Sequence, residues 1–130
     1  MIAKTVRVLM IAGALALTVA GAVPASARGN DDVERRGSCS AGSDWKLKLS
    51  PEDGRLEVEF EVDANVNGQT WRVRLLDNGT RFFSGTRTTV APSGSFELRR
   101  VTDDLAGTDH IRARATNAGT GETCVGNASI

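Results

Sequence analysis

The stretch Leu56-Glu-Val-Glu-Phe-Glu-Val-Asp-Ala-Asn-Val66 alternates apolar and polar residues from its first position to its last. Successive side chains of a β-strand point to opposite faces of the sheet, so this segment has one apolar and one polar face. The polar face carries a row of carboxylates: Glu57, Glu59, Glu61 and Asp63. The pattern is typical of a strand that buries one face in a core and exposes the other to water.

The same kind of alternation recurs along the chain after residue 38, and no segment there has apolar residues at helical spacing. We predict seven strands, separated by turn-forming sequences, at residues 44–50, 55–66, 69–77, 80–90, 95–101, 109–117 and 122–129. Short strands at this spacing predict an all-β fold made of two packed sheets. The apolar phase of the strands gives the predicted core: Leu56, Val58, Phe60, Val62, Trp71, Val73, Leu75, Phe96, Leu98, Ile111, Ala113 and Ala115.

The overall composition limits the possible partners of the protein. The chain has 130 residues, and 16 Lys and Arg balance 16 Asp and Glu, so the formal net charge is zero. One domain of ordinary size fits this length. A protein that binds nucleic acid through its overall charge needs an excess of basic residues, which this chain lacks. We therefore expect a monomer with no nucleic-acid partner.

The N-terminal segment has the features of an export signal. Lys4 and Arg7 precede an uncharged run at residues 8–23, and Ala25-Ser-Ala27 supplies small residues for a signal peptidase. This order is typical of a secretory signal peptide, predicted here at residues 1–27. The run is too short to span about 30 Å of hydrocarbon comfortably, which argues against a membrane anchor. We expect a secreted, extracellular protein with no membrane association after cleavage.

The predicted mature chain begins with a leader and contains two cysteines. Residues 28–38 are charged and almost free of apolar side chains, so we predict a disordered leader there and the folded domain at residues 39–130. Cys39 and Cys124 are an even pair in an exported chain, which favours a disulfide. The bridge would close a loop of about 85 residues and stabilise the fold by roughly 4 kcal/mol. The alternatives are a metal pair or two free thiols, although two Cys and one His without close spacing make a poor zinc site.

Two parts of the sequence resemble known β-sandwich domains. The run Leu105-Ala-Gly-Thr-Asp-His-Ile-Arg-Ala-Arg-Ala115 resembles the E–F corner and F strand of immunoglobulin-like and fibronectin type III-like domains, and Trp71 resembles their buried tryptophan. The corner tyrosine is absent, and the cysteines do not link the second and sixth predicted strands. The mature chain also resembles small secreted single-domain proteins of actinobacteria that lack an assigned activity. These resemblances imply an immunoglobulin-like sandwich and a secreted protein.

One segment has the spacing of a calcium-binding loop. Asp63-Ala-Asn-Val-Asn-Gly68 matches the first half of an EF-hand loop. The twelfth position of such a loop must hold a bidentate acid, and here it is Arg74. The segment is better explained as the end of a strand followed by an Asn-Gly turn. We predict no metal site.

Catalytic residues are equally hard to find. His110 is the only histidine, and three aspartates are close to it in sequence, but no Ser or Cys nucleophile motif accompanies it. The carboxylates at 57–63 are spaced regularly on one strand, which indicates a solvated face rather than a cleft. We predict no catalytic residues, no cofactor and no enzyme activity.

Two arrangements of the strands at 55–66 and 69–77 are compatible with the sequence. If Asn67-Gly68 is a two-residue hairpin turn, the strands pair, and Asp63 and Glu61 face Arg72 and Arg74. In an immunoglobulin-like sandwich they lie in different sheets, and 69–77 lies beside 109–117. The acidic row is then alone on its sheet, and a candidate binding patch forms on the other sheet from Arg72, Arg74, Arg112 and Arg114. The resemblance at the sixth strand favours the sandwich.

Elimination of other classes leaves a non-catalytic binding module as the first functional hypothesis. Its ligand is unknown, and an anionic cell-envelope polymer or an extracellular protein would fit the candidate patch. The alternative is a small inhibitor of an extracellular enzyme, with Phe83–Thr89 or Asp103–Asp109 as the inhibitory loop. Neither loop has a disulfide of its own to make it rigid. An enzyme is a distant third hypothesis.

Overall fold

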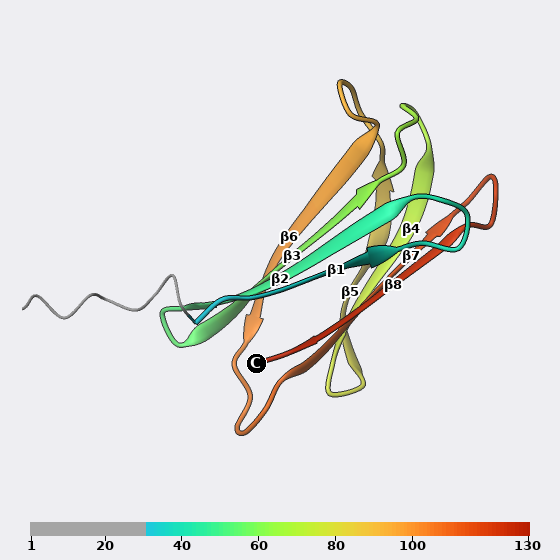
Figure 1. The fold of residues 1–130 in the computed structure, drawn as a ribbon. Helices are drawn as coiled ribbons and strands as arrows, with labels where there is room; N and C mark the ends of the chain where they lie inside the picture. The colour runs from blue at the N-terminus through green and yellow to red at the C-terminus, as the bar shows by residue number, and fades with distance from the viewer. Residues whose placement is uncertain (1–30) are drawn as a thin grey trace, which may run out of the picture.

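The computed structural model describes residues 31–130, which form eight β-strands (Figure 1). The predicted signal peptide at 1–27 lies outside the described residues. In chain order the strands are β1 (Val33–Ser38), β2 (Asp44–Glu52), β3 (Arg55–Asp63), β4 (Thr70–Asp77), β5 (Thr80–Thr88), β6 (Ser95–Asp103), β7 (His110–Asn117) and β8 (Thr123–Ser129). From residue 31 onwards, the chain contains no helix that could cross a membrane.

The strands form two antiparallel sheets that pack face to face. One sheet has the order β1-β2-β3-β6 and the other β5-β4-β7-β8, and they are visible as two layers in Figure 1. Successive strands β3 and β4 lie in different sheets, so the hairpin alternative is wrong, and β4 lies beside β7 as the sandwich requires. The prediction of an all-β sandwich is confirmed.

The chain leaves the first sheet earlier than predicted. Strand β3 ends at Asp63 rather than at residue 66. Asn65 has a φ of 54°, and its backbone N–H donates to the Asp63 carboxylate at 3.0 Å. Asparagine tolerates this left-handed conformation, and the local hydrogen bond competes with strand pairing. Val66 is therefore exposed, and the chain crosses to the second sheet.

An additional strand, β1, occupies part of the predicted leader. We expected disorder over residues 28–38, but Val33–Ser38 pairs with β2 along its whole length. The charged side chains do not prevent this, because β1 is an edge strand that needs to bury little apolar surface. Glu34 lies directly opposite Lys48, which also forms an ion pair with Asp32 at 3.4 Å. Backbone hydrogen bonds and cross-strand charge therefore replace the missing apolar contacts.

The hydrophobic core lies between the sheets and contains every predicted core residue. All of them are at most 5% exposed, and Leu47, Leu49, Cys124 and Ala128 join them. Trp71 of β4 is fully buried and packs against Phe96 of β6, with ring centroids 6.3 Å apart and planes tilted by 55°. This contact spans the two sheets, and edge-tilted aromatic pairs of this kind are favourable beyond their buried area.

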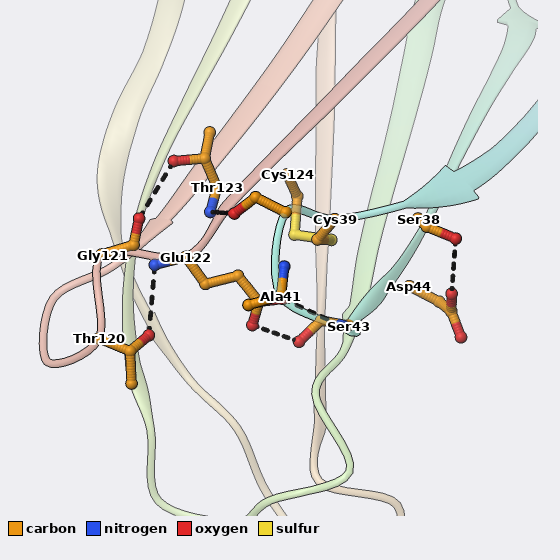
Figure 2. Close-up of a disulfide and its surroundings, with 11 residues drawn as sticks. Ser38, Cys39, Ala41, Ser43, Asp44, Thr120, Gly121, Glu122, Thr123 and Cys124 are labelled. Carbon is orange, nitrogen blue, oxygen red and sulfur yellow. Dashed lines mark hydrogen bonds between the residues drawn. A yellow bond between two sulfur atoms is a disulfide. The ribbon is translucent and has the colours of Figure 1, made fainter.

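A disulfide joins the two sheets where β1 and β2 meet β8. Cys39, which follows β1, is bonded to Cys124 of β8, and their Cα atoms are 4.3 Å apart (Figure 2). The predicted bridge is thus confirmed. Next to it, the half-buried Trp45 of β2 packs between Gly37 and Gly126, where a Cβ atom at position 37 would lie 2.6 Å from Trp45 Cζ2. Neither glycine can be enlarged without moving the tryptophan.

The Glu122 carboxylate connects the same two segments. It accepts hydrogen bonds from the Ala41 and Ser43 backbone N–H groups, each at 2.9 Å, and from the Ser43 hydroxyl at 2.7 Å (Figure 2). Burial alone would raise the pKa of Glu122, but the hydrogen bonds from Ser43 and Ala41 outweigh it and lower the pKa. The charged form of this buried carboxylate is therefore the one that the fold stabilises.

Candidate functional site

The four arginines predicted to form a patch lie on the outward face of the sheet β5-β4-β7-β8. Arg72 and Arg74 belong to β4, and Arg112 and Arg114 to β7. Arg74 is directly opposite Arg114 in the antiparallel pair, and Arg72 is opposite Thr116. The residues that alternate with them along both strands are buried, so all four side chains point away from the core.

Strand β5 adds a fifth arginine, Arg81, to this face. A register shift between Leu75 and Leu76 of β4 places Arg81 opposite Leu76, whose side chain lies on the outward face. The prediction did not include Arg81, because Phe82 and Phe83 interrupt the alternation of this strand. Because these two apolar residues are adjacent, the sequence does not show which side chains of β5 point outward unless the position of the bulge is known.

Hydroxyl side chains occupy the positions between and beside the arginines. On β5, Ser84 lies opposite Arg74, and Thr86 lies opposite Arg72. Thr116 of β7 lies on the other side of Arg72. The face thus presents hydrogen-bond donors of two kinds, guanidinium groups and hydroxyls, on three adjacent strands.

No carboxylate reaches this outward face from its own strands. Asp77 is the only acidic residue in β4, β5, β7 and β8, and it is buried on the inner side. Asp109 and Glu122, in the loops next to β7 and β8, are buried as well. Among residues 31–130, none of the ion pairs includes an arginine of this face. We call Arg72, Arg74, Arg81, Arg112 and Arg114 the arginine face.

The centre of the arginine face is hollowed. A depression there is lined by Arg72, Arg74, Arg81, Arg114, Ser84 and Thr116 together with Val73. Arg114 is partly buried at this place, and its Nε atom is inaccessible to solvent and has no hydrogen-bond partner among residues 31–130. Buried donors without a partner are uncommon in folded proteins, which distinguishes Arg114 from the other arginines of this face.

The outward face of the other sheet has a different charge pattern. Arg99 of β6 contacts the carboxylates of Glu57 and Glu59, and Lys46 of β2 lies 3.8 Å from Glu61. We expected the acidic row of β3 to be alone on its sheet, and this was wrong. Basic side chains of β2 and β6 flank it on both sides, because both strands carry charged residues in the outward phase.

Three further titratable groups, His110, Asp77 and Asp109, lie at or next to the ends of β4 and β7. The Nδ1 atom of His110 lies 2.7 Å from the Ser129 hydroxyl at the exposed end of β7 and β8. Burial raises the pKa of Asp77 to about 7, with a further contribution from the nearby carboxyls of Asp109 and Asp104. Asp109 is buried, and its backbone pairs with that of Ile130. Within the part of the chain that the structure describes, no three His, Cys, Asp or Glu side chains are placed to hold a metal ion.

Comparison with protein-family models, with curated proteins and with solved structures finds no match to this chain.

Proposed function

We propose that this protein is a secreted, non-catalytic binding module that attaches to an anionic polymer of the cell envelope through its arginine face. The observation that carries the proposal is the set of five arginines on one side of a sheet whose strands present no outward carboxylate. Guanidinium groups bind carboxylate and phosphate groups through paired hydrogen bonds, and several of them on one rigid sheet can bind a repeating anion.

The distribution of charge supports a surface-bound polymer as the ligand. The chain has no net charge, and on the opposite sheet the acids of β3 are paired with basic side chains of β2 and β6. Only one side of the molecule would therefore be attracted to a polyanion, which suits adhesion to an extended surface. Such attraction is screened over about 8 Å at physiological ionic strength, so binding should be sensitive to salt.

Two further observations support secretion and the finer fold assignment. The disulfide between Cys39 and Cys124 is compatible with an oxidising compartment outside the cytosol. The groups β2, β3, β6 and β4, β7, β8 correspond to the A-B-E and C-F-G strands of immunoglobulin-like sandwiches. We propose a fibronectin type III-like sandwich that is exported by the signal at 1–27.

The proposal is tested by retention of the secreted protein on anionic cell-wall material over a gradient of NaCl. The test variant replaces Arg72, Arg74, Arg112 and Arg114 by Gln. The matched control replaces Lys46, Lys48, Arg55 and Arg99, on the other sheet, by Gln and so removes the same amount of positive charge. We expect the test variant to lose salt-sensitive retention and the control to keep it, with far-UV circular dichroism confirming that both are folded.

Three outcomes would overturn the proposal. Retention of the test variant would show that the arginine face is not the binding surface. An equal loss in both variants would show that binding depends on net charge alone. Loss of binding after protease treatment of the wall material would identify a protein, rather than a polymer, as the partner.

A further inference from the structure

The pair formed by Arg74 and Arg114 lies at the centre of the arginine face. The two residues are direct cross-strand neighbours, so their Cβ atoms are about 4.5–5.5 Å apart. Like charges in this position repel each other, and no acid of the described chain forms an ion pair with either arginine. An anion between the two guanidinium groups would offset this repulsion.

The surroundings of the pair fit such an anion. Ser84 is directly opposite Arg74 on β5, and Thr116 is the next outward residue after Arg114 on β7, so one hydroxyl lies beside the pair across the sheet and another lies beside it along the strand. The depression that these residues line has a volume of about 370 Å³, which is enough for a small oxyanion and its substituent. Arg114 also lines this depression, and its Nε atom, which has no hydrogen-bond partner among residues 31–130, is buried beneath it.

The charge of the pair favours one class of oxyanion. A carboxylate or a phosphodiester carries one negative charge and leaves one of the two guanidinium charges without a counter-ion. A phosphomonoester carries about 1.5 to 2 negative charges at pH 7 and has three strong acceptor oxygens. Arginine together with Ser and Thr hydroxyls is also the donor set that proteins commonly use for phosphate oxygens.

We infer that Arg74 and Arg114, with the hydroxyls of Ser84 and Thr116, form a binding site for a phosphomonoester group. This inference deepens the proposed function and rests on the same face: the envelope polymer would carry phosphomonoester groups, and one of them would occupy this site. Arg72 and Arg81 border the depression and would contact neighbouring parts of the polymer.

The test is an NMR titration of the full secreted protein, observed at the arginine Nε–H groups at pH 7.5 and constant ionic strength. The probes are glycerol 1-phosphate as the monoester, dimethyl phosphate as the diester and acetate as the carboxylate. We expect the Arg114 Nε–H signal to shift with glycerol 1-phosphate, and at least about tenfold weaker binding of the other two probes. Equal binding of all three probes, or no saturable shift, would overturn the inference.

Two conservative variants separate this inference from the proposed function. Arg114→Lys keeps the charge but removes the buried Nε donor and the fork of N–H groups, so it should weaken glycerol 1-phosphate binding about tenfold. Arg55→Lys, the matched control on the other sheet, should leave phosphate binding unchanged. Retention on wall material should survive in both variants, because the positive charge remains.

Unchanged phosphate affinity in Arg114→Lys would contradict the phosphomonoester site. Retention of the four-Gln variant on wall material would instead contradict the proposed function.

Discussion

The two outward faces of the sandwich carry charge in different ways. On β1-β2-β3-β6, acids and bases alternate between neighbouring strands, and contacts such as Lys46 with Glu61 satisfy them within the face. On β5-β4-β7-β8, the arginines point outward, and the only strand acid, Asp77, is buried. The first face stabilises itself through its cross-strand pairs, whereas no ion pair among residues 31–130 neutralises the arginines of the second. The zero net charge of the whole chain therefore does not show how charge is distributed between the two faces.

Both faces depend on the core between them, so the largest effect is expected where the sheets meet. Trp71→Ala removes a fully buried side chain that contacts Phe96 of the opposite sheet. We expect the free energy of unfolding to fall by about 3–5 kcal/mol, because a large cavity remains. Urea denaturation monitored by circular dichroism measures the loss. A change below about 0.5 kcal/mol, the scale of an ordinary surface substitution, would mean that the two sheets are held together elsewhere.

Removal of the disulfide would break the covalent link between the two sheets, which joins Cys39 to Cys124 of β8. The double variant Cys39→Ala, Cys124→Ala should lose up to about 4 kcal/mol of stability, because the unfolded chain is no longer constrained. The fold should persist, since the alternating core does not depend on the bridge. Far-UV circular dichroism and urea denaturation test both parts, and mass spectrometry of the parent protein should show no alkylatable thiol. Loss of the β signal in the double variant would contradict the independence of the core.

Glu122→Gln should have a smaller effect that depends on pH. The substitution weakens three charge-assisted hydrogen bonds to Ala41 and Ser43, and we expect a loss of about 1–3 kcal/mol at neutral pH. Because the folded state lowers the pKa of Glu122, its contribution is present above the ordinary value of 4.5 and is lost as the pH falls below it. The difference in stability between the parent protein and the variant should thus shrink as the pH is lowered from 7 towards 3. A difference that stays constant over this range would exclude the carboxylate as its source.

The smallest effects should come from matched charge reversals on the two faces. Arg74→Glu places a carboxylate opposite Arg114 and should raise stability by about 0.2–1 kcal/mol. Glu59→Arg places a third base between Lys48 and Arg99 and should lower stability by a similar amount. Urea denaturation at low salt measures both, and high salt should reduce both effects. If Arg74→Glu and Glu59→Arg change the stability in the same direction, the two faces do not differ in their charge pattern.

The features that the sequence predicted correctly arise from local pattern or from unique chemistry. Alternation along each strand identified the core, because burial of one face sets the phase of a strand. The two cysteines had only each other as partners. The juxtaposition of Arg74 and Arg114 required one further step, the resemblance that placed their strands side by side.

The features that the sequence did not predict depend on contacts between strands and loops, which the pattern within one strand does not contain. Strand β1 has little apolar surface and is held by pairing with β2, so its composition resembles that of a disordered segment. Glu122 bonds to residues about 80 positions away, a relation that no local pattern contains. Arg81 reaches the arginine face through a bulge whose position is a property of the β4–β5 pair.

The one-sided placement of the arginines has a consequence for any wall that the protein coats. A polycation that adsorbs to a negative particle exposes its surplus charge and can reverse the sign of the surface. This molecule would lie with the arginine face inward and turn outward the opposite face, where Glu57, Glu59 and Glu61 are balanced by Lys46 and Arg99. A coated particle should therefore keep its negative electrophoretic mobility even at saturation, so that the cell gains a protein layer without losing its repulsion from other cells.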